Sequence, residues 1–180
     1  MGILAAVRKF LGPFTPKSMY RTWVFYIVNH WLSYPGGFKI KRVLLNSLHN
    51  IDLGVGVKVV GPIKITVNRL QIGKNTWVGK NFMCNGNGTV TIGCNCDIAP
   101  EVIFNTGGHE IGTPERRGGE GVVFHQTIGN GCWIGARSTF INNCSVGDSS
   151  VVASCACVGK QFQPNVIVGG VPAKVIKELH

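Results

Sequence analysis

A six-residue hydrophobic repeat organises the middle and the end of the chain. The repeat occurs in runs, and within each run every sixth residue is aliphatic or phenylalanine and is usually followed by glycine or another small residue. The residues at this first position are Ile72, Val78, Ile92, Ile98, Ile128, Ile134, Phe140, Val146, Val152 and Val158. This period matches neither an amphipathic helix, which repeats about every 3.6 residues, nor a long strand, which alternates. The repeat therefore predicts short strands joined by sharp corners, where glycine and asparagine tolerate left-handed backbone angles.

Stacked coils follow from the same repeat. Three such units close one triangular coil, and stacked coils bury a continuous aliphatic column, as in other repeat solenoids. The fifth position carries a small or weakly polar side chain that suits an interior corner: Thr76, Cys96, Cys132, Ser138, Cys144, Ser150 and Ala156. We interpret the cysteines among them as corner fillers rather than metal or redox sites. The chain has seven cysteines and shows no export signal, so a disulfide framework is not expected.

The repeat is interrupted between Phe104 and Ile128. We predict that residues 105–127 leave the solenoid as a loop that is rich in glycine and in titratable side chains. These side chains are His109, Glu110, Glu115, Arg116, Arg117, Glu120 and His125. Long loops in compact domains are often functional. The interruption is therefore the expected place for chemistry.

Composition and charge exclude several classes of protein. Of 180 residues, 25 are glycine, 14% are charged and 44% are hydrophobic, whereas a disordered chain combines low hydrophobicity with high net charge. No apolar run reaches the ~18 residues that a membrane-spanning helix requires. No secretory signal opens the chain, so a cytoplasmic protein is expected. The net charge of +10 suggests an anionic partner such as nucleic acid, a membrane surface or a phosphorylated small molecule, with simple solubility as the alternative.

Three segments carry a resemblance to a known family. Residues 89–102 (TVTIGCNCDIAPEV) lead into a Gly-His pair, residues 128–136 (IGNGCWIGA) follow the loop, and residues 164–177 (PNVIVGGVPAKVIK) approach the end of the chain. The chain thereby resembles the hexapeptide-repeat acyltransferases over roughly residues 53–177, and among them the galactoside, maltose and polysaccharide O-acetyltransferases. The resemblance implies an all-β fold, a left-handed parallel β-helix with an N-terminal helical segment and a short C-terminal tail. It also implies a homotrimer with sites between adjacent subunits, acetyl-CoA as co-substrate, and no metal.

The resemblance also assigns the catalytic residues. His109 stands where the family has its catalytic histidine, and an imidazole can take the proton of an attacking hydroxyl near neutral pH. Asn85, in the segment NFMCNGN, is similar to the family's active-site asparagine, which would stabilise the developing oxyanion. Asn85 precedes His109 by about one coil, so stacking could bring the two together. The alternative interpretations are a corner asparagine with a left-handed backbone and a surface histidine. His125 lacks the motif context and is interpreted as structural.

Contacts with coenzyme A are implied at seven positions. These positions are Trp133, Ala136, Ser154, Gly159, Lys160, Lys174 and Lys177. Trp133 would line the pantetheine channel, and the three lysines would hold the phosphates as point charges. The alternative for Trp133 is a coil-surface side chain packed on a neighbour. At Gly159 the family usually has a hydroxyl residue.

The first fifty residues do not follow the repeat. We divide the chain into an N-terminal helical segment (residues 1–50), the β-helix (51–163) and a C-terminal tail (164–180). An aromatic-rich stretch runs from Tyr20 to Tyr34, after a first stretch in which apolar residues have helical spacing: Leu4, Val7, Phe10 and Leu11. We favour a helical cap on the open end of the solenoid, which repeat proteins require. The alternative is a basic helix that contacts the inner membrane face.

We therefore expect an acetyl-CoA-dependent O-acetyltransferase that acts on a hydroxyl of a sugar or of a surface-polysaccharide precursor. An N-acetyltransferase of the same fold, acting on an amino sugar or an antibiotic, is the alternative within acyl transfer. A zinc hydratase would need three converging histidines, and only His109 and His125 lie near the loop. A nucleic-acid binder would use the positive charge, but the basic residues are not interleaved with stacking aromatic residues, so no nucleic acid is expected as a partner.

Overall fold

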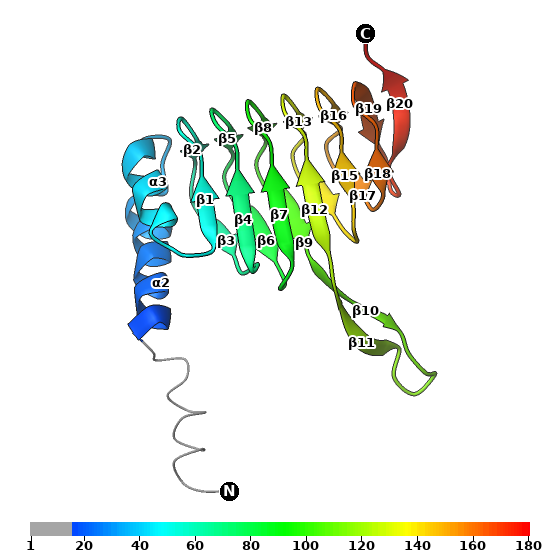
Figure 1. Cartoon of the computed structure of the whole chain (residues 1–180), viewed down its shortest axis with the longest axis horizontal. Helices are drawn as coiled ribbons and strands as arrows, with labels where there is room; N and C mark the ends of the chain where they lie inside the picture. Colours follow the sequence, from blue (N-terminus) through cyan, green and yellow to red (C-terminus); the bar gives the residue numbers. More distant parts are fainter. Residues whose placement is uncertain (1–15) are drawn as a thin grey trace, which may run out of the picture.

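The six-residue repeat folds into short strands that stack in three sheets. The computed structural model describes residues 16–180, which form a left-handed parallel β-helix preceded by helices (Figure 1). The first sheet contains β1 (Ile51–Leu53), β4 (Arg69–Ile72), β7 (Thr89–Ile92), β12 (His125–Ile128), β15 (Ser145–Val146) and β18 (Gln161–Phe162). The second contains β2 (Lys58–Val59), β5 (Trp77–Val78), β8 (Asp97–Ile98), β13 (Trp133–Ile134), β16 (Val151–Val152), β19 (Val166–Gly169) and β20 (Lys174–Glu178). The third contains β3 (Ile63–Ile65), β6 (Phe82–Asn85), β9 (Ile103–Asn105), β14 (Thr139–Phe140) and β17 (Cys157–Val158).

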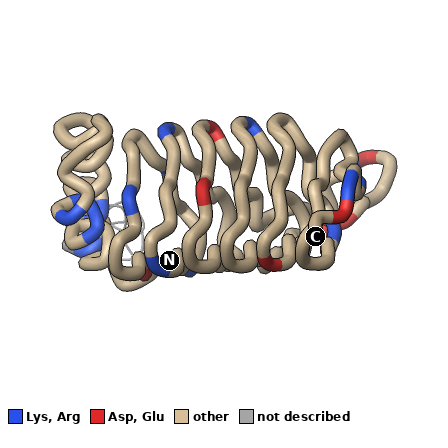
Figure 2. The backbone as a smooth tube through the Cα atoms, turned by 90° about the horizontal axis from the view of Figure 1, so that it is seen from above, with Lys and Arg blue, Asp and Glu red and all other residues tan. Residues whose placement is uncertain are grey.

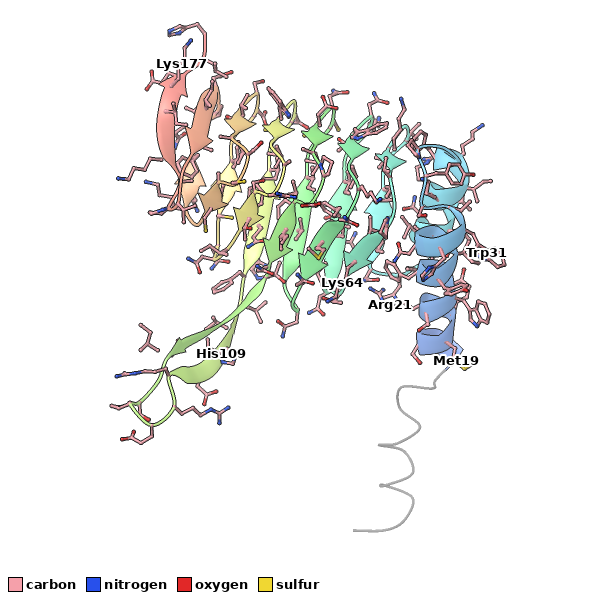
Figure 3. The ribbon with its side chains drawn as sticks, turned by 180° about the vertical axis from the view of Figure 1, so that it is seen from behind. Met19, Arg21, Trp31, Lys64, His109 and Lys177 are labelled. Carbon is pink, nitrogen blue, oxygen red and sulfur yellow. The ribbon has the colours of Figure 1, made fainter. Side chains whose placement is uncertain are left out.

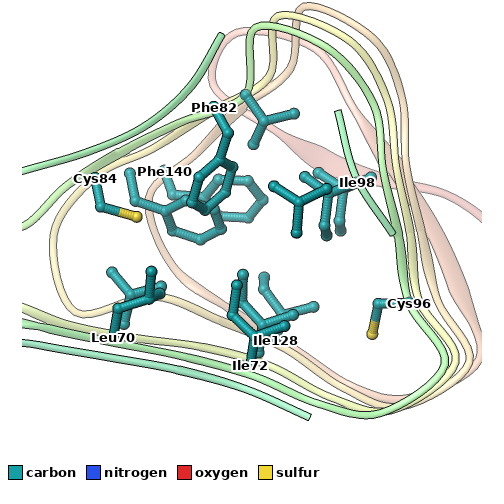
Figure 4. Close-up of a cluster of buried hydrophobic side chains, with 14 of the residues drawn as sticks. Leu70, Ile72, Phe82, Cys84, Cys96, Ile98, Ile128 and Phe140 are labelled. Carbon is teal, nitrogen blue, oxygen red and sulfur yellow. The ribbon is translucent and has the colours of Figure 1, made fainter. Parts of the chain in front are cut away.

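The core is a column of side chains inside the coil (Figure 4). Every residue at the first position of the repeat is buried, and the fifth-position residues are buried with them. Phe104 stacks on Phe140 with ring centroids 4.3 Å apart, and Phe82 lies 5.8 Å from Phe104. Truncation of such a buried ring costs about 3–5 kcal/mol. The aromatic stack therefore ties three successive coils together.

The corners of the coil use left-handed backbone angles, as the repeat predicts. We number each corner by the sheet that precedes it. The non-glycine residues with positive φ are Asn75, Asn81, Asn95, Glu101, Arg137, Asn142, Ser149, Cys155 and Asn165. Glu101 and Arg137 lie on successive coils at the second corner, where Arg137 Nε donates to Glu101 Oε2 at 2.6 Å. Asparagine occupies five of these positions because its short polar side chain tolerates this conformation better than most.

The fifth-position cysteines fill the interior of the corners. Cys96 Sγ donates to the carbonyl oxygen of Gly129 at 3.1 Å, and Cys132 Sγ donates to that of Gly147 at 3.2 Å. Each thiol thus satisfies a backbone carbonyl of the next coil. Burial raises the pKa of the Cys144 thiol to about 12, so this thiol stays protonated near neutral pH. These contacts account for the cysteines as packing groups.

Two helices and a π-helical turn cover the open end of the coil. They are α2 (Pro16–Tyr26), η2 (Ile27–Trp31) and α3 (Phe38–Asn46). Val24 and Val28 are buried in the continuous core, as are residues of α3 and of the turn after it. The amide of Asn29 bonds both backbone groups of Ile63, with Nδ2 donating to O and the Ile63 N–H donating to Oδ1, each at 2.9 Å. The open edge of β3 is thereby paired at Ile63, which hinders the addition of a strand from another chain there.

The last coil differs from the expected tail. The structure continues the second sheet with β19, which pairs in parallel with β16, and only then turns back as β20, antiparallel to β19. The six-residue period is broken before residue 163 because the third corner of this coil is short. Val158 and Phe162 both point inward, and they are four residues apart instead of six. The period resumes from Phe162 to Val168. Within residues 16–180 no helix is long and apolar enough to cross a membrane. The helical spacing expected from Leu4 to Leu11 lies outside the described residues.

Candidate active site

A β-hairpin leaves the coil at the third corner and carries the candidate histidine (Figure 1). It consists of β10 (Gly107–Ile111) and β11 (Gly118–Val123), which pair antiparallel. At its base the Phe124 N–H donates to the Thr106 carbonyl at 2.8 Å, and the Thr106 side chain is buried. The Phe124 carbonyl approaches Gly88 so closely that an added Cβ would lie 1.9 Å from it. The expected loop is thus an ordered hairpin, and β12 begins at His125, within the range expected to be loop.

The ring of His109 is oriented by the opposite strand of the hairpin. Its Nδ1 lies 2.9 Å from the carbonyl oxygen of Gly119. A carbonyl can only accept, so the neutral imidazole carries its proton on Nδ1 and leaves the lone pair of Nε2 free. His109 is exposed, and its cross-strand partner is Gly121, which has no side chain to cover the ring. The geometry leaves Nε2 available to accept a proton from a substrate.

A hollow of about 370 Å³ lies beside His109. Its lining consists of Asn87, Gly107, Gly108, His109, Gly121, Val122 and Val123. Asn87 is a residue that the family motif does not mark as functional. The signal was present, since residues 85–88 read Asn-Gly-Asn-Gly and two side-chain amides of one turn were available. The structure brings the second of these amides, rather than Asn85, into the hollow with His109.

Asn85 lies at the base of the hairpin. It pairs in register with Asn105 on the next coil, and its Nδ2 donates to Asn105 Oδ1 at 3.3 Å. Its Oδ1 is buried and has no hydrogen-bond partner among the described residues. The Asn85 carbonyl accepts from the Thr106 N–H at 2.8 Å and so holds the strand that leads into the hairpin.

His125 lies on the first sheet, away from His109. Its Nδ1 is 2.8 Å from Thr89 Oγ1, and its backbone N–H donates to Asn143 Oδ1 at 2.7 Å. These contacts fit the structural role expected of it. The described part of the chain, residues 16–180, holds no group of three or more His, Cys, Asp or Glu side chains placed for a metal ion.

Five of the expected coenzyme A positions gather along the second sheet and the second corner. Ala136 and Ser154 line a hollow of about 370 Å³ at that corner, on successive coils. Lys174 pairs with Gly169 at the end of the sheet. Trp133 and Lys177 lie in one lateral row of the same sheet, with Val151 and Ile167 between them. The Trp133 ring is exposed, so in the single chain it does not pack as a covered surface residue.

The other two positions lie at the third corner. Gly159 and Lys160 follow β17 there, and a Cβ added to Gly159 would lie 3.2 Å from Ile141 Cγ1. Lys160 Nζ lies 5.4 Å from the Phe162 ring centroid. The third sheet separates these two residues from those at the second corner. One chain therefore presents two separate groups of candidate coenzyme A residues, and the hairpin leaves the coil at the corner of the second group. Figure 3 shows His109 on this hairpin and Lys177 on the last strand.

The fold and the site define a class of protein, a hexapeptide-repeat β-helix with a histidine on an extruded hairpin. The family model described as "Bacterial transferase hexapeptide (six repeats)" matches residues 127–160. The galactoside O-acetyltransferase of Escherichia coli (strain K12) is 40% identical over 156 residues, which are 86% of this chain and 75% of that protein. The putative colanic acid biosynthesis acetyltransferase WcaF of the same organism is 28% identical over 141 residues, 76% of this chain and 74% of that one.

A solved structure agrees with these sequence matches. A galactoside acetyltransferase in complex with coenzyme A superposes with a TM-score of 0.78 and 31% identity, covering 91% of this chain and 81% of that chain. The chain belongs to the hexapeptide-repeat acetyltransferases. It is an acyltransferase, and the galactoside acetyltransferase structure that it resembles holds coenzyme A. The left-handed β-helix expected from the resemblance is confirmed.

Proposed function

We propose that the protein is a homotrimeric O-acetyltransferase that acetylates a hydroxyl of a sugar or of a surface-polysaccharide precursor, with His109 as the general base. The observation that carries the proposal is the contact of His109 Nδ1 with the Gly119 carbonyl, which leaves Nε2 free on an exposed hairpin. The names of two relatives, a galactoside O-acetyltransferase and a colanic acid biosynthesis acetyltransferase, support a sugar acceptor.

The proposed chemistry needs one group to move a proton twice. His109 Nε2 takes the proton of the acceptor hydroxyl as its oxygen bonds to the acetyl carbonyl carbon. The carbon–sulfur bond then breaks, and His109 returns the proton to the departing thiolate. The carbonyl of Gly119 keeps the ring in the tautomer that can accept at Nε2, and it stabilises the imidazolium between the two transfers.

The proposed oxyanion donor is a side-chain amide at the third corner. Negative charge develops on the acetyl carbonyl oxygen, and an oriented N–H donor stabilises it. Asn85 is the family-derived candidate, and its Nδ2 bond to Asn105 is long at 3.3 Å, which leaves this donor weakly held. Asn87 is the candidate that shares the hollow with His109. Separate Asn85→Ala and Asn87→Ala variants distinguish the two candidates. The variant that lacks the oxyanion donor should lower kcat by about 10²–10³, and the other variant should not.

The proposed coenzyme A site lies between subunits. The third sheet separates His109 within one chain from the residues along the second sheet and the second corner, namely Trp133, Ala136, Ser154, Lys174 and Lys177. A neighbouring subunit that presents its second corner to the hairpin would complete the site. Lys160, beside Gly159 at the third corner, then adds a cation from the subunit that supplies His109. Ammonium groups suit phosphates as point charges, and the exposed Trp133 ring suits an apolar pantetheine chain.

A matched pair of acceptors tests the substrate class. Coenzyme A release is measured with a panel of sugars, nucleotide sugars and oligosaccharides, and each hydroxyl sugar is paired with its amino analogue. We expect release with the hydroxyl member of a pair and an ester product by mass spectrometry. Release that requires the amino member would replace this proposal with the N-acetyltransferase.

A further inference from the structure

The outer side of the N-terminal helices carries a cluster of exposed aromatic rings. We call Trp23, Tyr26, His30 and Trp31 the aromatic face. Tyr26 lies at its centre, with ring centroids 6.0 Å from Trp23, 4.6 Å from His30 and 6.3 Å from Trp31. The exposed fraction is 58% for Trp23, 46% for Tyr26 and 67% for Trp31. The helices thus bury one side in the core and leave the other unpartnered in the described chain.

The two sides of the continuous segment α2–η2 have separate tasks. Val24, Val28 and Asn29 face the coil, and Arg21 also turns inward, where its guanidinium donates to Asn50 Oδ1 at 2.8 Å and to the Ile65 carbonyl. Figure 3 shows Arg21 toward the coil and Trp31 and Met19 on the opposite side. These inward contacts are sufficient to attach the helical cap to the end of the coil. The cap alone does not require tryptophan and tyrosine on the outside.

The charge of this end has one sign. Residues 1–51 contain no Asp or Glu, and their cations are Arg8, Lys9, Lys17, Arg21, Lys39, Lys41 and Arg42. Figure 2 shows Lys and Arg on the helical end with no acidic residue among them. Arg21 and Lys41 are used inside the fold, whereas Lys17 and Lys39 are exposed. A surface with charge of one sign, here positive, attracts anionic groups and repels cationic ones.

Aromatic rings with exposed lysines match the chemistry of a bilayer surface. Tryptophan and tyrosine combine an apolar ring with a polar N–H or O–H and concentrate at the boundary between hydrocarbon and water. Cations near that boundary are attracted to anionic headgroups. We propose that the aromatic face, together with the exposed Lys17 and Lys39 of the same helical end, binds the surface of an anionic lipid bilayer.

Vesicle binding by the full chain tests this proposal. The protein is sedimented with vesicles of phosphatidylcholine alone and of phosphatidylcholine mixed with phosphatidylglycerol, at low and at high salt. We expect binding to the anionic vesicles that weakens with salt, and none to the neutral ones. Trp23→Ser with Trp31→Ser should lower the affinity by about tenfold or more, since binding scales with buried apolar area. Val171→Ser with Ile176→Ser, exposed apolar residues at the other end of the coil, should leave it unchanged.

A charge pair and an assembly measurement complete the test. Lys39→Glu should weaken binding by about fivefold or more, whereas Lys80→Glu, an exposed lysine on the coil, should change it by less than about twofold. Trp31→Ser alone, at the most exposed ring, gives the same readout if the double variant does not fold. Failure of the wild type to bind anionic vesicles, or equal binding by the tryptophan variants, would overturn the proposal. So would a smaller assembly of these variants without lipid, which would make the face a contact between proteins.

Discussion

Lys41 shows how a single residue fixes the N-terminal helices. It is completely buried, although lysine in a helix is almost always exposed. Its Nζ donates to the Tyr34 carbonyl at 2.8 Å and lies 4.9 Å from the Phe38 ring centroid and 5.6 Å from that of Tyr34. One carbonyl and two ring faces are a limited replacement for water, so desolvation lowers the pKa of Lys41. This contact ties the start of α3 to the turn before it.

The lowered pKa makes stability depend on pH in a known direction. Between the folded pKa of Lys41 and its ordinary value of 10.5, the unfolded chain binds more protons than the folded protein. The free energy of unfolding of the wild type should therefore rise with pH in this window, relative to Lys41→Met, which keeps the stem and lacks the charge. Denaturant unfolding of both proteins from about pH 8 to about pH 10.5 measures the difference. A difference that stays constant with pH would contradict the assignment.

At the scale of elements, the hairpin is joined to the coil only at its base. Most residues of β10 and β11 are exposed, and the hydrogen bond of Phe124 to Thr106 closes the base. A two-residue Asn-Gly turn can connect two strands at such a closed pair. The hairpin is therefore an attachment that the solenoid does not need for its core.

Excision of the hairpin should separate stability from activity. Replacing residues 107–123 by Asn-Gly should change the free energy of unfolding by no more than about 1 kcal/mol, because few apolar side chains lose contacts. Coenzyme A release should fall to background, since His109 is removed. Circular dichroism with denaturant unfolding measures the first effect and a thiol assay the second. Loss of the folded coil, or residual turnover near that of the wild type, would show that the hairpin has a different role.

The sequence predicts the coil far better than it predicts the hairpin. Ile98 and Ile134 could be placed inside the coil, and Cys96 and Cys132 in its corners, because the period of six repeats the same local geometry. The hairpin has no such period: its glycine-rich strands do not alternate, so the register of His109 opposite Gly121 leaves no trace in the sequence.

The details of the site depend on contacts that are distant along the chain. The partner of His109 is a backbone carbonyl ten residues away. Every residue has a backbone carbonyl, so no residue type in the sequence marks this partner. The resemblance to the family could assign His109 and Asn85, but the hollow that joins His109 to Asn87 depends on how the third corner stacks. The sequence predicts a helical segment for the cap, whereas the pairing of Asn29 with Ile63 follows from the tertiary fold.

At the scale of the whole molecule, the chain presents the parts of the proposed site on separate corners. His109 and Lys160 belong to the third corner, while Ala136, Ser154 and Lys174 belong to the second. A closed ring of three copies would bring the second corner of each copy to the third corner of the next. Such a head-to-tail contact gives a closed ring when the successive rotations between copies add up to a full turn.

The molecular mass in solution tests this arrangement. We expect sedimentation equilibrium to give three times the chain mass of 19.4 kDa. Mixing a His109→Ala protein with a Ser154→Trp protein, each inactive alone, should restore part of the activity, because some mixed trimers contain one site with both intact residues. A monomeric mass with full activity would contradict a site shared between subunits.

The central claim is that His109 Nε2 accepts the proton of the acceptor. It is tested most directly by His109→Ala, with His125→Ala as the matched histidine control, using the acceptor that the wild type turns over fastest. We predict that His109→Ala lowers kcat for coenzyme A release by about 10²–10⁴, with the oligomeric mass and the KM for acetyl-CoA little changed. His125→Ala should keep wild-type turnover. Wild-type turnover by His109→Ala would contradict the claim.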